Sequence, residues 1–167
     1  YDPPPRDAAL TNDSACAQTS ATASRQPLDM FVLFDASISM RYNTGGTLLS
    51  NTNADCNVDA NPVKDSRWCK SVVALSAYFN SAASAGNAAA LQFFGNSSCD
   101  GSAYDQSVQP GGDTGFTSLP SSQFDDDLNG ASPTQSTPLE GAVRGIIGFT
   151  ARPANRRAGR TTIGVLI

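Results

Sequence analysis

The chain has 167 residues, a length typical of one domain with a sizeable hydrophobic core. Its net charge is −4, and basic residues gather only between positions 152 and 160, so we do not expect nucleic acid as a partner. The chain has no histidine, which excludes a Ser-His-Asp or Cys-His nucleophile system and any zinc site that needs histidine. We therefore do not expect an enzyme.

Residues 1–27 are predicted to form an extended leader that crosses the surface of the domain. They lack periodicity, contain Pro3 to Pro5 and are rich in Ser, Thr and Ala. No run of residues has the length and apolar character of a signal peptide or a membrane span. We therefore expect no direct membrane span, and we expect either a mature form or a fragment of a secreted protein.

The stretch from Leu28 to Met40 organises the rest of the chain. Its uninterrupted apolar run, Met30 to Phe34, predicts a strand buried on both faces of a parallel sheet. In the next loop Asp35, Ser37 and Ser39 place a carboxylate and two hydroxyls at alternate positions, where open α/β sheets bind ligands. Such oxygens suit Mg²⁺ or Ca²⁺. Capping of the next helix is the alternative, but capping needs one oxygen and this loop offers three.

A long polar insertion follows at residues 41–66 and is rich in Asn and Gly. It is longer than a strand-to-helix connection needs, so it is either a functional rim over the site or a disulfide-tied loop. Its carboxylates Asp55, Asp59 and Asp65 lack the regular spacing and the glycine turn of an EF-hand. We interpret them as residues of a solvated loop.

The four cysteines, Cys16, Cys56, Cys69 and Cys99, form no Cys-x-x-Cys pair. An even number in polar surroundings favours disulfides over free thiols, and hence an oxidising compartment, outside the cell or at its surface. Of the three connectivities we prefer Cys56 with Cys69, because this pair would tie the two ends of the insertion together. Cys16 would then pair with Cys99.

Two regular elements are predicted after the insertion. Over residues 66–83 Trp68, Val72, Leu75 and Phe79 recur at helical spacing, which predicts a helix whose aromatic residues belong to the core. Residues 88–94 then read as a second buried strand.

Residues 95–128 are predicted to contain an edge strand or hairpin and a short helix. The β-like pieces lie near residues 107–109 and 116–119, and the helix covers residues 121–128. The acidic run Asp125 to Asp127 resembles a cluster of metal-binding carboxylates. Three consecutive residues of a helix point in three directions, however, so they cannot all bind one ion. We therefore interpret this run as a solvated face.

The last two predicted elements are a helix and a third buried strand. Pro138 is well placed as the first residue of a helix that Thr137 caps, and the apolar pattern continues until Arg152 and Pro153. The strand covers residues 161–167. Taken alone, Thr137 is only a helix cap.

The Asp-x-Ser-x-Ser stretch at Asp35 resembles the metal-ion-dependent adhesion site of von Willebrand factor A-type domains, a fold that integrin inserted domains share. Many members have Gly where this chain has Ile38, a position that does not bind the metal. The stretch Thr-Pro-Leu-x-x-Ala-Val is similar to the second motif of that site, where a Thr supplies another oxygen. The resemblance implies Asp35, Ser37, Ser39 and Thr137 as metal site residues, with Thr134 as the runner-up for the last position.

The resemblance covers residues 28–167 and about the first two thirds of the family's domain. It implies an α/β fold with a doubly wound, mainly parallel, Rossmann-like sheet flanked by helices. The third motif of the family, a loop with an Asp, does not occur in this sequence, nor do the final strands and helix. We therefore expect a partial domain that is incomplete at the C-terminus.

The resemblance implies a secreted or cell-surface adhesion module. Ser37 and Ser39 would bind Mg²⁺ or Ca²⁺ directly, and Asp35 and Thr137 directly or through water, with one position left for a carboxylate of a protein partner. The alternative is a structural subunit of a surface assembly or filament that keeps the fold without metal-dependent binding. Further partners would then be other subunits or the missing C-terminal part of the same domain.

Overall fold

The computed structural model describes residues 25–49, 56–60, 64–108, 115–133 and 136–167. Residues 1–24 of the expected leader, Cys16, Asp55 and Thr134 lie outside these ranges. Within them no helix is long and apolar enough to cross a membrane. The strands and α-helices, in chain order, are β1 (Leu28–Asp35), α1 (Arg67–Asn80), β2 (Ala88–Phe94), β3 (Thr117–Ser118), α2 (Gln123–Gly130), α3 (Leu139–Ala151) and β4 (Thr161–Leu166).

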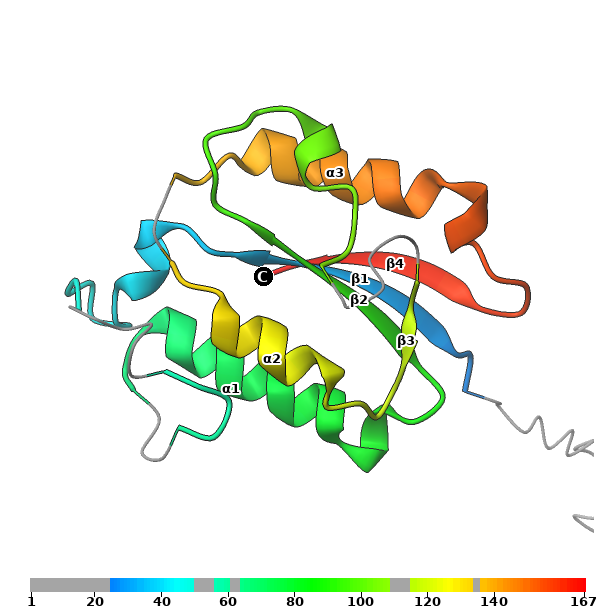
Figure 1. Cartoon of the computed structure of the whole chain (residues 1–167), viewed down its shortest axis with the longest axis horizontal. Helices are drawn as coiled ribbons and strands as arrows, with labels where there is room; N and C mark the ends of the chain where they lie inside the picture. The colour runs from blue at the N-terminus through cyan, green and yellow to red at the C-terminus, as the bar shows by residue number, and fades with distance from the viewer. Residues whose placement is uncertain (1–24, 50–55, 61–63, 109–114, 134–135) are drawn as a thin grey trace, which may run out of the picture.

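The strands of this α/β structure form one open, mostly parallel sheet with the order β3-β2-β1-β4 (Figure 1). β1 is parallel to both of its neighbours, β2 and β4, and the two-residue β3 pairs antiparallel to β2. The chain first crosses from β1 through α1 to β2, and later returns through α3 to β4 on the other side of β1. The connections therefore diverge at β1.

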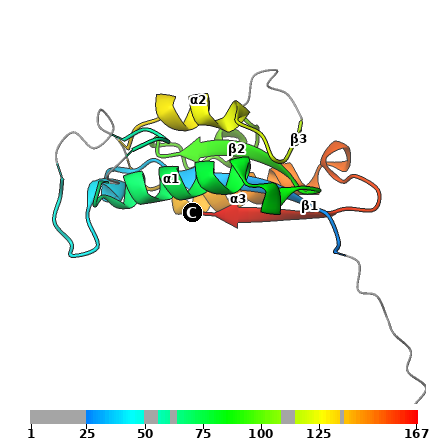
Figure 2. The same ribbon diagram turned by 90° about the horizontal axis from the view of Figure 1, so that it is seen from below.

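β1 is buried on both faces, as its apolar run predicts. Met30, Val32 and Phe34 belong to the core under α1 and α2, whereas Phe31 and Leu33 belong to the core under α3. Figure 1 shows α1 and α2 on one side of the sheet and α3 on the opposite side, and Figure 2 shows α1 in front of the strands. Because both faces are covered, the strand contains no polar alternation.

α1 begins after Ser66, whose hydroxyl accepts a hydrogen bond of 3.0 Å from the backbone N–H of Cys69. Its predicted apolar stripe is buried, and the ring of Trp68 stacks on Phe34 with centroids 4.7 Å apart. This aromatic pair fixes α1 against the carboxyl half of β1, close to Asp35.

α3 packs closely against residues 98–104, which follow β2. A Cβ atom at Gly145 would lie 2.7 Å from the Cβ of Tyr104, so glycine is needed for this approach. Phe149 stacks on Phe31 with centroids 3.8 Å apart and anchors the other half of the helix to the sheet. The helix begins at Leu139, with Pro138 as its N-cap, so the prediction of Pro138 as the first helical residue was wrong by one position.

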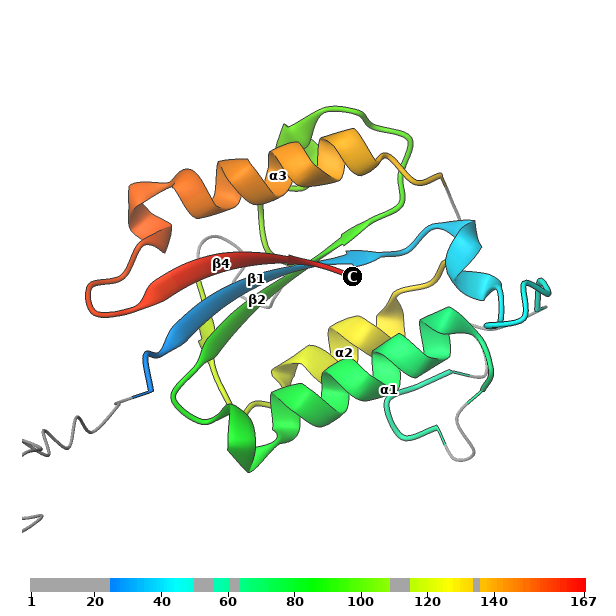
Figure 3. The ribbon, with the colours of Figure 1, turned by 180° about the vertical axis from the view of Figure 1, so that it is seen from behind.

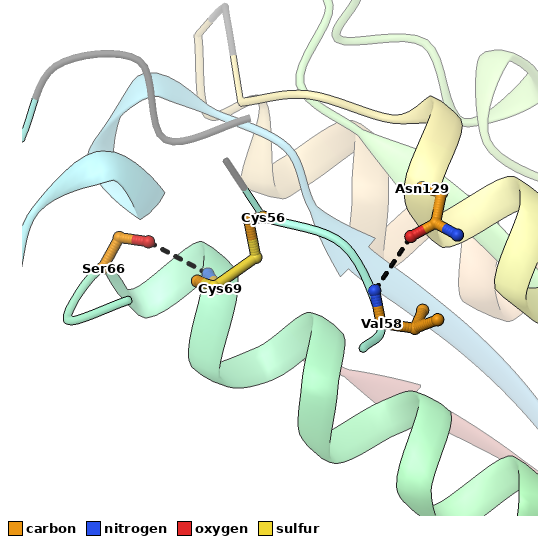
Figure 4. Close-up of a disulfide and its surroundings, with 5 residues drawn as sticks. All are labelled: Cys56, Val58, Ser66, Cys69 and Asn129. Atoms are coloured by element: carbon orange, nitrogen blue, oxygen red, sulfur yellow. Dashed lines mark hydrogen bonds between the residues drawn. A yellow bond between two sulfur atoms is a disulfide. The ribbon is translucent and has the colours of Figure 1, made fainter. Parts of the chain in front are cut away.

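A disulfide joins Cys56 to Cys69 in the first turn of α1, with their Cα atoms 5.3 Å apart (Figure 4). The preferred pairing of these two cysteines is confirmed. Two residues further on, Val58 donates its N–H to Asn129 Oδ1 of α2 at 2.9 Å. Cys99 is exposed and has no disulfide partner within the described part of the chain, so its pairing with Cys16 stays a prediction.

Two predictions for polar segments were wrong in part. The run Asp125 to Asp127 is not simply a solvated face, because Asp125 accepts hydrogen bonds from Ser76 of α1 at 2.7 Å and from Asn80 at 3.1 Å. Of the β-like piece near residues 107–109, residues 107 and 108 belong to no strand, although Val108 donates its backbone N–H to Leu91 O of β2 at 2.8 Å, and residue 109 lies outside the described ranges. In the insertion, Asp59 and Asp65 are exposed, as a solvated loop predicts.

Candidate functional site

The loop after β1 lies between the carboxyl ends of both neighbouring strands. Asp35 donates its N–H to Ile167 O beside β4 at 2.8 Å, and Ala36 donates its N–H to Phe94 O of β2 at 2.6 Å. Since the chain connections diverge at β1, this is the position where open α/β sheets form a ligand crevice. Backbone hydrogen bonds thus hold the start of the loop on both sides.

Asp35, Ser37 and Ser39 are linked by hydrogen bonds within the loop. The Asp35 Oδ1 atom accepts a hydrogen bond of 2.7 Å from the backbone N–H of Ser37, and the hydroxyl groups of Ser37 and Ser39 share a hydrogen bond of 2.8 Å. Ser37 is fully buried, while Asp35 and Ser39 are partly buried. The residue between the two serines, Ile38, points outward and is 47% exposed. The structure therefore brings three of the four predicted site residues together.

Helix capping does not account for the predicted hydroxyls. Ser37 precedes the short 3₁₀ helix at Ile38–Arg41, and its side chain makes no cap hydrogen bond. Thr137 precedes the N-cap of α3, and no side-chain hydrogen bond caps that helix. The alternative interpretation of these residues as caps is contradicted.

Thr137 lies just before α3 and is exposed. In Figures 1 and 3 the first turn of α3 lies at the same end of the molecule as the loop after β1. The backbone oxygen of Thr137 accepts the N–H of Leu139 at 2.9 Å, and the hydroxyl of Thr137 makes no hydrogen bond to Ser37 or Ser39. Thr137 is thus at the predicted end of the sheet, but no direct contact joins it to the other three residues.

Gly95 supports the loop from behind and was not identified from the sequence. A Cβ atom at this position would lie 2.7 Å from the backbone oxygen of Ala36. Because that neighbour is backbone, only glycine allows the end of β2 to lie so close to the loop. A glycine directly after a predicted strand was the available signal.

The donor set fits a small, hard cation. Around Mg²⁺, with metal–oxygen distances of about 2.1 Å, adjacent oxygens of an octahedron lie about 3.0 Å apart, and the larger Ca²⁺ spreads them further. The 2.8 Å between the two serine oxygens is the length of the hydrogen bond that joins them, so this distance does not select one of the two ions. In the described ranges no three His, Cys, Asp or Glu side chains gather as a metal cluster, so a cation at this loop would depend on hydroxyl ligands and one carboxylate.

Comparisons of the chain with protein-family models, with curated proteins and with solved structures find no match. The features that bear on the function are therefore the residues of this chain and their geometry. The relevant facts are the position of the loop at the centre of the sheet and the chemistry of its oxygen atoms.

Proposed function

We propose that this protein is a metal-dependent protein-binding module of the von Willebrand factor A type, located outside the cytoplasm, which holds Mg²⁺ in the loop after β1. The observation that carries the proposal is the 2.8 Å separation of the Ser37 and Ser39 hydroxyl oxygens beside the Asp35 carboxylate. Ca²⁺ also suits these oxygen ligands, and the hydrogen-bonded spacing of the two hydroxyls does not select between the two ions.

The strand order supports this choice of fold. The order β3-β2-β1-β4, with helices on both faces, is compatible with the first part of the doubly wound arrangement 3-2-1-4-5-6, although β3 is antiparallel. In such sheets the switch point lies between strands 1 and 4, where Asp35 and Ile167 are joined by a backbone hydrogen bond. A ligand loop at that point is expected from topology alone.

The residues have distinct roles in this proposal. Ser37 and Ser39 bind the ion through their hydroxyls, and Asp35 binds it directly or through water while it fixes the loop by accepting the Ser37 N–H. Thr137 adds an oxygen directly or through water. Because one carboxylate neutralises only part of the charge, the bound ion supplies a Lewis acid for a partner's Asp or Glu side chain. No bond is broken, so the activity is recognition.

The location and the partner follow from the same features. A disulfide between Cys56 and Cys69 favours an oxidising compartment. The exposed side chain of Ile38 lies within the ligand loop and offers an apolar contact beside the ion. The partner is a protein that presents a carboxylate.

A pair of short peptides tests this function. In Mg²⁺, acetyl-Gly-Glu-Gly-amide should shift the amide NMR signals of residues 35–39, whereas the Gln peptide should not. EDTA and Asp35→Ala should abolish the shifts, and Ser97→Ala, at an exposed serine outside the loop, should leave them unchanged. Shifts that persist in EDTA, or the absence of any shift with the Glu peptide, would contradict the proposal.

One observation favours the alternative of a structural subunit. Leu139, Val143 and Ile147 form an apolar stripe along α3 and are 52%, 42% and 60% exposed. In Figure 3 the strand β4 beside this helix is the outermost strand, and no described strand pairs with its free edge. Assembly through this surface should survive EDTA and Asp35→Ala but be lost on Val143→Ser, as measured by light scattering. A monomer at all concentrations would exclude this candidate.

A further inference from the structure

A hollow at the amino end of β4 is lined by polar side chains from three segments. Its volume is about 270 Å³, and Thr150 of α3, Arg156 and Arg160 of the connection, and Thr162 of β4 line it. Thr162 lies at the start of β4, whereas the candidate metal loop lies beside its carboxyl end. The two sites are therefore separate, and ligand binding in the hollow does not depend on the proposed function.

Arg160 is held rigidly at one side of the hollow. Its Nε atom donates to the fully buried Asp29, and its Nη2 atom donates to the backbone oxygens of Leu28 at 3.0 Å and Gly86 at 2.9 Å. Arg157 binds the same carboxylate through Nε at 2.7 Å. One negative charge is thus shared by two guanidinium groups, which leaves an excess positive charge and, among the described residues, an Nη1 atom of Arg160 without a partner.

Arg156 supplies the second positively charged side chain of the hollow. Its Nε atom donates to Thr150 O at 3.1 Å, which places the guanidinium group beside the last turn of α3. Its two terminal nitrogens have no partner in the described part of the protein. The neighbouring Arg152 is already paired with Asp105, so it does not compete for a ligand. A guanidinium fork with both terminal nitrogens free is suited to an oxyanion.

The two threonines offer acceptors, not donors. Thr150 donates its hydroxyl proton to Ile146 O at 2.8 Å, and Thr162 donates its proton to Asn155 O at 2.9 Å. With their protons engaged, these oxygens present lone pairs to a ligand. A ligand that satisfies the whole lining must accept hydrogen bonds from arginine and donate one to threonine.

We propose that this hollow binds inorganic phosphate. Both forms of orthophosphate that exist at neutral pH combine charged oxygens for the arginines with a P–OH group that can donate to a threonine oxygen. Sulfate has the same shape but carries no proton at this pH, so its oxygens would face the threonine lone pairs without a hydrogen bond. The lining therefore distinguishes two isosteric anions.

Isothermal titration of the whole chain with phosphate, at constant ionic strength and pH 7, tests the proposal. Arg156→Gln should weaken phosphate binding about tenfold, the effect of losing a charged hydrogen-bond donor. Arg144→Gln is the matched control, because it removes one positive charge from α3 at an exposed pair with Glu140. It should leave the phosphate affinity unchanged.

Titration with sulfate and the variant Thr162→Val test whether the threonine oxygen distinguishes the two anions. Native protein should bind sulfate several-fold more weakly than phosphate, and Thr162→Val should remove that preference while Arg156→Gln weakens both anions. Equal binding of the two anions by the native protein would overturn the assignment to phosphate. No phosphate binding, or equal losses in Arg156→Gln and Arg144→Gln, would overturn the site itself.

Discussion

The hydroxyl oxygens of Ser37 and Ser39 lie 2.8 Å apart at the carboxyl end of β1. They share a hydrogen bond, and the two residues before them are held on both sides of the loop, because Asp35 donates its N–H to Ile167 O and Ala36 donates its N–H to Phe94 O of β2. Changes that move the backbone behind the loop should therefore disturb the candidate site.

Gly95→Ala should disturb the loop directly. The added Cβ atom would lie 2.7 Å from Ala36 O, and relief of this clash requires a backbone shift. We expect a loss of about 1–3 kcal/mol in the free energy of unfolding, measured in urea, together with weaker Mg²⁺ binding. Gly115→Ala is the control, since a Cβ atom there meets no neighbour within 4 Å. Equal stability of the two variants would show that the close approach of Gly95 to Ala36 does not contribute to stability.

Removal of the disulfide should destabilise the protein. Cys56 and Cys69 are separated by 13 positions, and closure of a loop of this length contributes about 2–3 kcal/mol through the unfolded chain. The double variant Cys56→Ser, Cys69→Ser should lose about this much in a urea titration, and reduction of the native protein should reproduce the loss. Peptide mapping without reductant provides the direct control, and a linkage of Cys56 to another cysteine would refute the pairing.

The ion pairs of Asp29 should make stability depend on acid pH. Burial raises the pKa of Asp29, but hydrogen bonds from Arg157 and Arg160 outweigh it and bring the pKa below its ordinary value of 3.8. Because the pKa is lower in the folded state, the stabilisation is present above pH 3.8 and is lost as the pH falls through the folded value.

Asp29→Asn should cost about 3 kcal/mol at neutral pH, since it leaves two arginines without their buried partner. It should also flatten the loss of stability in acid. Asp65→Asn, which breaks an exposed pair with Lys70, should cost under about 1 kcal/mol. Identical acid profiles for native protein and Asp29→Asn would contradict this account.

Asp127→Asn should stabilise the protein at neutral pH. Burial, and next the nearby charge of Asp126, raise the pKa of Asp127, and its Oδ2 atom is buried without a hydrogen-bond partner among the described residues. An acid whose pKa is raised on folding is destabilising when ionised, so removal of the charge should raise the melting temperature. Asp126→Asn, at an exposed position, should have less effect. A lower melting temperature for Asp127→Asn would mean that its carboxylate has a favourable partner.

The central elements of the fold could be predicted because their signals are local. The apolar run of β1 and the helical spacing of Trp68, Val72 and Phe79 reflect burial against neighbours that any α/β sheet provides. The disulfide was predictable because Cys56 and Cys69 bracket one polar insertion. The order of the strands was not predicted, since periodicity carries no information on which strands pair.

The contacts that were missed join residues far apart in the sequence. Asp29 was part of a predicted strand, and nothing near it indicated that arginines 128 and 131 positions later would bind it. Asp125 likewise looked solvated, because its partners Ser76 and Asn80 lie on another helix. At the candidate site, the local spacing of Asp35, Ser37 and Ser39 was informative, whereas the distance to Thr137 depends on how α3 is placed.

A crystal structure of the protein grown in Mg²⁺ tests the central claim most directly. We predict one ion bound by Ser37 Oγ and Ser39 Oγ at about 2.1 Å, with Asp35 and Thr137 bound to it directly or through water. An ion bound elsewhere, or an unoccupied loop in which the hydroxyls of Ser37 and Thr137 face away from each other, would contradict the claim.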